Sequence, residues 1–158
     1  MKYALSATEV SVERDQQVLL APVSFTLSAG RSLALVGKNG AGKTTLLRLV
    51  AGILAPTSGV LTLFGDRPDE TKELFRSRLA VLIGLPPLAR NLTLREHLVL
   101  IGITWSNTPD EALGQADDIL DELQIVSLAR RFPHELSSGQ TQLFALALTL
   151  ARPFDVLS

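Results

Sequence analysis

The sequence contains no cysteine, and it has only one tryptophan and one tyrosine. The lack of cysteine excludes a disulfide framework and thiolate metal sites. The longest apolar run, Leu143 to Ala151, is about half of the roughly 20 residues that a membrane-spanning helix needs. The N-terminal residues lack the charged-then-apolar pattern of a secretory signal. We therefore expect no membrane span and a reducing, cytoplasmic environment.

Neither sign of charge is in excess. Fifteen Lys and Arg residues stand against sixteen Asp and Glu residues, which gives a net charge of -1. This balance excludes a global basic surface, so we expect no nucleic-acid partner and only local phosphate recognition. A length of 158 residues with 46% hydrophobic content predicts a single domain with a buried core.

The first half of the chain alternates strand and helix patterns. Two strands separated by the turn signal at Asp15 predict an N-terminal antiparallel sheet. The following segments predict a buried strand, a helix, a short strand, a helix and a second buried strand: 32–37, 44–54, 60–64, 69–78 and 79–84. This alternation indicates an α/β core.

The second half changes to helical patterns. Thr93 and Glu96 form a capping-box pattern at the start of one helix, and Pro109 opens a second amphipathic helix. Residues 90–135 therefore look like a helical insert. A strongly apolar helix follows the Ser-Ser-Gly sequence at 137–139 and ends at Arg152-Pro153, after which a new strand begins.

A phosphate-loop pattern lies between the predicted strand 32–37 and the predicted helix 44–54. The pattern G-x-x-x-x-G-K-[ST] is satisfied in full, and the expected nucleotide contacts are Gly37, Asn39, Gly40, Ala41, Gly42, Lys43, Thr44 and Thr45. Backbone N–H groups and the helix dipole would hold phosphates, with Lys43 at the β- and γ-phosphates and Thr44 on Mg²⁺. The alternative is a glycine-rich turn of no function. We expect ATP or another purine triphosphate with Mg²⁺, although the motif alone does not separate kinases, GTPases and ATPase motors.

A second candidate anion site is the sequence Leu136-Ser-Ser-Gly-Gln140. It can be read as an ordinary helix N-cap, and equally as a helix N-terminus with free amides and hydroxyls that attract an anion.

Together these motifs resemble those of the ATP-binding-cassette (ABC) transporter ATPases, whose signature is LSGGQ. The resemblance implies a P-loop NTPase core of the RecA type, an N-terminal antiparallel β-sheet and a helical subdomain. It also implies a head-to-tail dimer in which Ser137, Ser138, Gly139 and Gln140 contact ATP held by the second ATPase domain. Ser138 replaces the usual glycine, which would cost about 1–2 kcal/mol if the backbone there were left-handed.

Three further positions differ from the family pattern. In the family, an aromatic residue ahead of the second strand stacks on adenine, and Arg14 falls near that position here. A guanidinium can also stack on a base. Gly84 stands where relatives carry a Gln or Glu near the metal. Glycine has no side chain, which places in doubt the normal coupling of this loop to the metal and to the membrane partner. Leu148 replaces a common arginine.

The last residues raise a separate expectation. In the family, a strand like Asp155–Ser158 continues to the Asp that holds magnesium and the Glu that orients water, so both would lie beyond Ser158. We expect one incomplete cassette: 1–84 sheet and phosphate-loop core, 85–135 helical subdomain, and 136–158 signature helix and strand start. Asp155 is no substitute for the missing carboxylates, and helix 141–151 should be partly uncovered.

These features lead to competing hypotheses. The leading one is an ATPase subunit of an ABC transporter, peripheral on the inner face of the cell membrane, working with a transmembrane permease subunit; this chain alone would be inactive in hydrolysis. Alternatives are a non-catalytic nucleotide-binding fragment or degenerate subunit, an ABC-type ATPase outside transport, and a nucleotide kinase in which the second motif is coincidental.

Overall fold

The computed structural model describes residues 3–105 and 108–158. The chain forms two compact units, Met1–Arg76 and Ser77–Ser158, which we describe separately. The boundary between them falls inside the segment 1–84 that the sequence places in one core. Within the described residues, the structure contains no helix of the length and apolarity that crossing a membrane requires.

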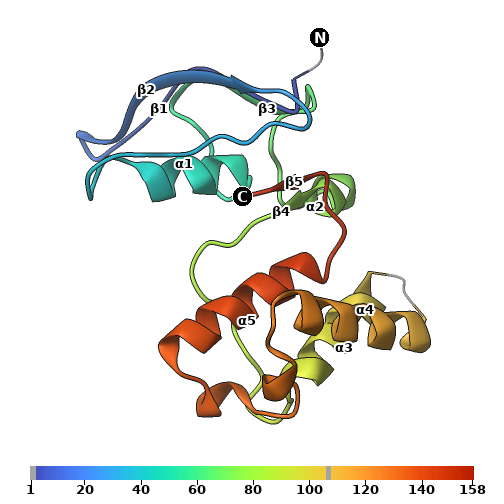
Figure 1. The fold of residues 1–158 in the computed structure, drawn as a ribbon. Coiled ribbons are helices and arrows are strands. Elements are labelled where there is room, and N and C mark those ends of the chain that lie inside the picture. The colour runs from blue at the N-terminus through green and yellow to red at the C-terminus, as the bar shows by residue number, and fades with distance from the viewer. Residues whose placement is uncertain (1–2, 106–107) are drawn as a thin grey trace. The chain divides into compact units, whose positions relative to one another are not determined.

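The first unit is built on a three-stranded antiparallel sheet (Figure 1). Strands β1 (Leu5–Arg14), β2 (Gln17–Leu27) and β3 (Ser58–Leu63) lie in the order β2-β1-β3. The predicted hairpin is confirmed: Asp15 and Gln16 have φ values of 50° and 63°, and positive φ at both central residues is typical of the tight turn that matches strand twist.

A bulge in β1 keeps one face of this sheet apolar. The register shifts between Ala7 and Val10, where Glu9 has a φ of 49°. The extra residue returns Val10 and Val12 to the face that holds Leu5, and all three are buried. Helix α1 (Lys43–Val50) lies along the sheet and buries Leu46, Leu49 and Val50 (Figure 1).

The prediction of a buried strand at 32–37 is wrong. Every residue from 31 to 38 is exposed and none belongs to a strand; Val36, for example, is 94% exposed. A strand requires a neighbour that accepts and donates its backbone hydrogen bonds. Among the described residues no strand pairs with this segment, so its apolar composition is not sufficient to make it a strand.

Helix α1 is also shorter than the predicted 44–54. It ends at Val50, and Gly52 follows with a φ of 73°. The N–H groups of Ile53 and Leu54 turn back to the carbonyl of Arg48, which satisfies a carbonyl at the helix end.

The second unit holds the helical subdomain. It contains helices α3 (Leu94–Thr104), α4 (Pro109–Glu122) and α5 (Ser138–Leu150), and two short 3₁₀ turns, Val126–Leu128 and Pro133–Glu135, lie between α4 and α5 (Figure 1). Their shared core centres on Phe144, which is fully buried with Leu94, Leu98 and Leu120. Leu148 belongs to the same core, which explains a leucine there.

Each of these helices begins with the cap that its sequence predicts. In α3, the Thr93 N–H donates to Glu96 Oε2 at 2.7 Å, and the Glu96 N–H donates to Thr93 Oγ1 at 3.3 Å. The Thr93 hydroxyl and N–H that donate to this carboxylate hold the pKa of Glu96 below its ordinary value. Thr108 and Glu111 repeat the arrangement in α4.

A short parallel sheet completes this unit. Helix α2 (Glu73–Arg78) leads into β4 (Leu79–Ala80), which pairs with β5 (Val156–Leu157). The strand expected after Arg152-Pro153 is thereby confirmed, whereas the one expected at 79–84 spans only its first two residues. Helix α2 starts later than predicted because the Asp69 carboxylate accepts from the Thr71 N–H and forms a turn there.

The expectation that helix 141–151 is partly uncovered holds for one residue in particular. Leu143 is 42% exposed, while Phe144, Ala147 and Leu148 are buried within the second unit. Most of the apolar surface of α5 is therefore covered by α3, by α4 and by the turns between α4 and α5.

Candidate nucleotide-binding site

The phosphate loop lies where the sequence predicts it, directly before α1. Gly42 caps this helix with a φ of 84°, and Gly40 has a φ of 82°. A Cβ on Gly42 would lie 2.7 Å from the Leu19 carbonyl oxygen and 2.8 Å from Leu20 Cδ1. Gly42 is thus required both by its backbone conformation and by the close approach of β2.

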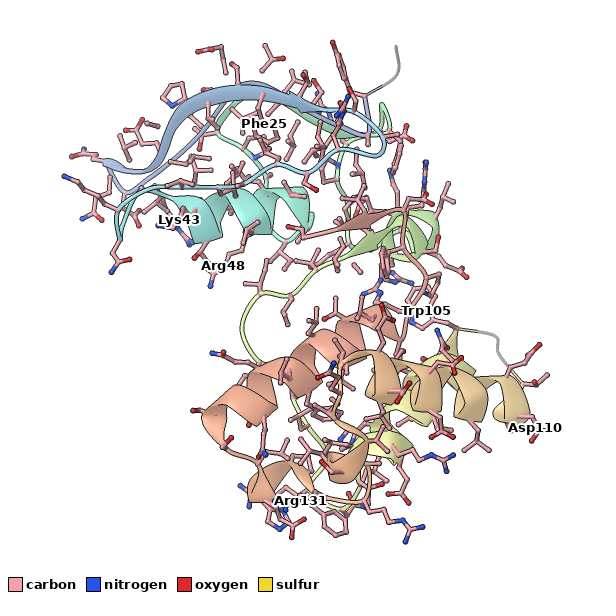
Figure 2. All side chains as sticks on the ribbon, viewed as in Figure 1. Phe25, Lys43, Arg48, Trp105, Asp110 and Arg131 are labelled. Carbon is pink, nitrogen blue, oxygen red and sulfur yellow. The ribbon has the colours of Figure 1, made fainter. Side chains whose placement is uncertain are left out.

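Lys43 lies at the first position of α1, and its side chain turns back over the loop (Figure 2). Its Nζ donates to the carbonyl oxygens of Gly37 at 2.7 Å and Lys38 at 2.8 Å. These contacts hold the ammonium group against the loop carbonyls, on the residue that begins α1. A positive charge at that point adds to the helix dipole and attracts phosphate.

All of the predicted loop contacts except Gly37 line one cavity of about 390 Å³ in the first unit. Its lining consists of Val18, Leu19, Asn39, Gly40, Ala41, Gly42, Lys43, Thr44 and Thr45. A lysine, two hydroxyls and a helix N-terminus form the donor set that a triphosphate requires, and the Thr44 hydroxyl oxygen suits a hard cation such as Mg²⁺. The residues present therefore fit a nucleotide with its metal.

Val18 is a lining residue that the sequence interpretation missed. It is 67% exposed at the edge of this cavity, where an apolar side chain can lie against a base. An apolar residue inside a strand pattern predicts burial, so the sequence offered no signal for it. Arg14, the sequence-based candidate, pairs with Gln17 at the hairpin end and is not among the residues that line the cavity. Its side chain is 78% exposed, with Nε 4.0 Å from the Asp15 carboxylate.

The second motif forms the N-terminus of α5. The Ser137 hydroxyl accepts from the Gln140 N–H at 3.3 Å, and Gln140 Oε1 accepts from the Ser137 N–H at 2.9 Å. Gln140 therefore also has a structural role in this chain. Ser138 is the first helical residue and has no positive φ, so the left-handed strain considered for it does not arise. Ser138 and Gly139 are exposed.

The structure thus assembles two groups of predicted residues, each within its own unit. The loop 37–45 belongs to the first unit, and the motif 137–140 belongs to the second. Each has the amide and hydroxyl donors of an anion site at a helix start.

Gly84 and Asp155, two positions discussed in the sequence analysis, lie in the second unit. Gly84 has a φ of 72°, a conformation that side chains rarely adopt, and a Cβ there would meet no atom within 4 Å. The limit on a larger residue is therefore backbone strain and not space. Asp155 accepts a 2.8 Å hydrogen bond from Arg78 Nε, and its N–H donates to the Arg78 carbonyl, so it serves to anchor β5.

The chain is similar in sequence to known proteins. The ABC transporter family pattern matches residues 20–158. An ABC transporter ATP-binding protein of Brucella suis is 37% identical over 99% of this chain and 66% of its own length. The Nod factor export ATP-binding protein I of Sinorhizobium fredii is 33% identical over 93% of the chain and 43% of its own length. The chain thus spans less than two thirds of the length of these relatives.

Solved structures agree. The ATP-binding subunit of an ABC transporter, 28% identical, superposes with a TM-score of 0.79 over 95% of this chain and 63% of its own. The cbiO1 protein of Clostridium perfringens shares the fold at 24% identity, with a TM-score of 0.83 over 99% of this chain and 64% of its own. With the phosphate loop and the signature helix in the expected order, the chain belongs to the family of ABC transporter ATP-binding subunits.

Proposed function

We propose that this chain binds MgATP at the phosphate loop 37–45 and acts as part of a cassette that hydrolyses ATP to drive transport. The observation that carries the proposal is that the Lys43 side chain turns back onto the Gly37 and Lys38 carbonyls and lines the same cavity as Thr44 and Thr45. Lys43 would neutralise the β- and γ-phosphates, and the backbone N–H groups of the loop would orient them. Thr44 would hold Mg²⁺, which neutralises charge as the phosphoryl group leaves.

We further propose that the α5 motif completes a site on a second ATPase domain. Ser137, Ser138 and Gly139 would present a hydroxyl and free amides to phosphates bound there. This head-to-tail arrangement is what the family resemblance implies. A transmembrane permease subunit would be the second partner, which would hold the assembly at the inner face of the cell membrane.

Hydrolysis is proposed for the complete cassette. In the family, carboxylates that follow the β5 strand hold the metal and orient the attacking water. The second candidate function is nucleotide binding without turnover, and Gly84 favours it because glycine offers no side chain where relatives use a Gln or Glu. Single-turnover ATP hydrolysis by the complete cassette, with and without Gly84→Gln, separates the two.

The binding proposal is tested with a fluorescent ATP analogue and Mg²⁺. Lys43→Ala removes charge-assisted contacts worth about 1.5–3 kcal/mol, so affinity should fall by roughly 10- to 100-fold. Lys72→Ala is the matched control, because Lys72 lies outside the loop and pairs with Asp69. Equal affinity of Lys43→Ala and wild type would show that the phosphate loop does not bind nucleotide.

A further inference from the structure

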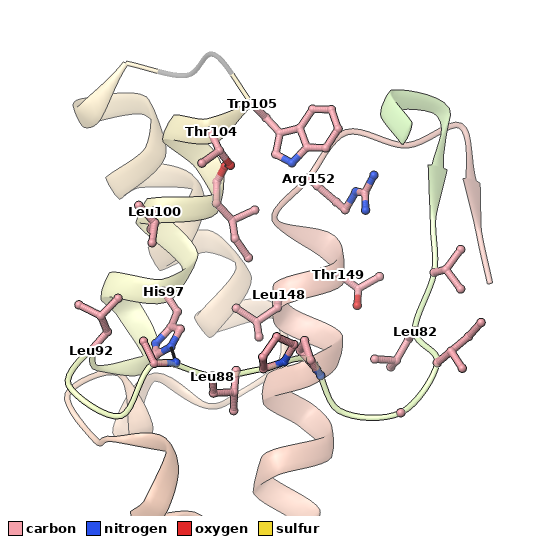
Figure 3. Close-up of a pocket in the computed structure, with 17 residues that line it drawn as sticks. Leu82, Leu88, Leu92, His97, Leu100, Thr104, Trp105, Leu148, Thr149 and Arg152 are labelled. Atoms are coloured by element: carbon pink, nitrogen blue, oxygen red, sulfur yellow. Dashed lines mark hydrogen bonds between the residues drawn. The ribbon is translucent and has the colours of Figure 1, made fainter. Parts of the chain in front are cut away.

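His97 is a buried histidine whose two ring nitrogens both contact the backbone. It lies on α3 and is 8% exposed. The Ala89 N–H donates to His97 Nε2 at 3.0 Å (Figure 3). His97 Nδ1 lies 2.8 Å from the Thr93 carbonyl oxygen. The Phe144 ring meets the imidazole edge to face, with centroids 5.5 Å apart, and restricts its rotation.

These partners determine which nitrogen carries the proton. The Ala89 N–H can only donate, so Nε2 accepts with its lone pair. The Thr93 carbonyl can only accept, so Nδ1 carries the hydrogen. The observed geometry therefore requires the neutral ring. A second proton on Nε2 would face the Ala89 N–H donor to donor and break this hydrogen bond.

The contact at Ala89 ties an otherwise irregular segment to α3. Residues 85–92 form no helix or strand, and they border a cavity of about 470 Å³ together with α3 and the end of α5 (Figure 3). This segment begins directly after Gly84. Its position on α3 therefore depends on the hydrogen bond to His97 and on the packing of Leu88 against the helical core, and not on a secondary-structure ladder.

The charged groups around His97 give little support to a positive ring. Arg152 is the other titratable residue among those that line the cavity. Helix α5 carries no charged side chain from Ser138 to Leu150, and Arg90 is the charged residue of the segment 85–92. On α3, Glu96 is engaged by Thr93, and Arg95 is paired with Asp117 of α4. The segment after α4 that contacts the start of α3 contributes two more cations, Arg130 and Arg131.

We propose that His97 is a positioning residue that holds the segment 85–92 on α3 while its ring is neutral and releases the segment when Nε2 is protonated. This segment follows Gly84, where relatives carry a Gln or Glu, and any effect on a membrane partner rests on the proposed function. The proton-dependent tie itself does not, since it requires neither nucleotide nor a second chain.

The test is amide hydrogen exchange of Ala89 across pH, corrected for intrinsic exchange. In the wild type, protection of this amide should fall by at least about tenfold as the pH is lowered, because a proton on Nε2 removes the acceptor. His97→Gln places an amide oxygen near the Nε2 position, so protection should persist and lose its pH dependence. His97→Leu removes the acceptor and should abolish protection throughout. His134→Gln is the matched control because His134 is the other histidine and is exposed.

A second, independent experiment measures directly which nitrogen of the His97 ring carries the proton. The ¹⁵N spectrum of the wild type at neutral pH should show an unprotonated Nε2 and a protonated Nδ1. The opposite tautomer would overturn the proposal, even if the variants fail to fold. So would a pH dependence of Ala89 exchange that is the same in His97→Gln and in wild type. Loss of ATP binding in Lys43→Ala should leave the Ala89 exchange and the ¹⁵N spectrum of His97 unchanged. Failure of the His97 proposal is therefore distinct from failure of the proposed function.

Discussion

Replacing glycine by alanine at two positions of the phosphate loop tests the close packing of this loop on β2. Gly40 and Gly42 have nearly equal φ values, 82° and 84°. Alanine in this left-handed region costs roughly 1–2 kcal/mol at either position. A Cβ on Gly40 meets no atom within 4 Å, whereas one on Gly42 lies 2.7 Å from the Leu19 oxygen. Forced overpacking adds about 1–3 kcal/mol, so Gly42→Ala should cost about 2–5 kcal/mol.

The measurement is urea unfolding without nucleotide, with hydrogen exchange as a local probe. The Leu46 N–H, which donates to the Gly42 carbonyl at 2.8 Å, reports on the first turn of α1. Gly42→Ala should be less stable than Gly40→Ala by about 1–3 kcal/mol and should expose this amide more strongly. If the two variants unfold within about 0.5 kcal/mol of each other, the close approach of loop and strand is wrong.

Three further predictions concern the second unit. Phe144→Ala should destabilise it by about 3–5 kcal/mol in chemical unfolding, because this ring is fully buried, whereas Phe154→Ala, at 38% exposure, should cost much less. Ser137→Ala removes the α5 cap and should cost about 1 kcal/mol, measured in the same way. The pKa of Glu96 is lowered by hydrogen bonds from Thr93. The ionised carboxylate therefore adds to the free energy of unfolding above its ordinary pKa of 4.5, and this contribution is lost as pH falls through the lower pKa of the folded state. Glu96→Gln should remove this part of the acid sensitivity, measured as unfolding midpoints against pH.

Matched results would contradict each of these. Equal destabilisation by Phe144→Ala and Phe154→Ala would place the core elsewhere. A Ser137→Ala variant as stable as wild type would show that the hydroxyl does not cap α5. An unchanged acid transition in Glu96→Gln would mean that the Thr93 contacts do not favour the ionised carboxylate.

The starts of α3 and α5 were predictable because each depends on residues close together in the chain. Thr93 and Ser137 cap their helices through partners three residues later, and the pattern of residue types is sufficient to identify them. The hairpin turn at Asp15 and the loop glycines are equally local. The order of residue types along the chain is therefore sufficient to locate the phosphate loop and the α5 motif.

The strand at 32–37 could not be predicted correctly from composition. An apolar run indicates burial only if other segments cover it, and no described strand pairs with this one. The same limit applies to Val18, whose place beside the loop depends on how β2 packs against Gly42. It also applies to His97, whose bond to Ala89 links a helix to an irregular segment.

Local sequence was enough to identify the phosphate loop, the capped helices and the family resemblance, because these require contacts over a few neighbouring residues. Tertiary structure decided which residues line the cavity at the phosphate loop, the left-handed conformation of Gly84 and the two backbone contacts of the His97 ring. Each of these depends on backbone torsions or on hydrogen bonds to groups brought near by folding. Such contacts have no fixed spacing in the chain, so no pattern of residue types encodes them directly.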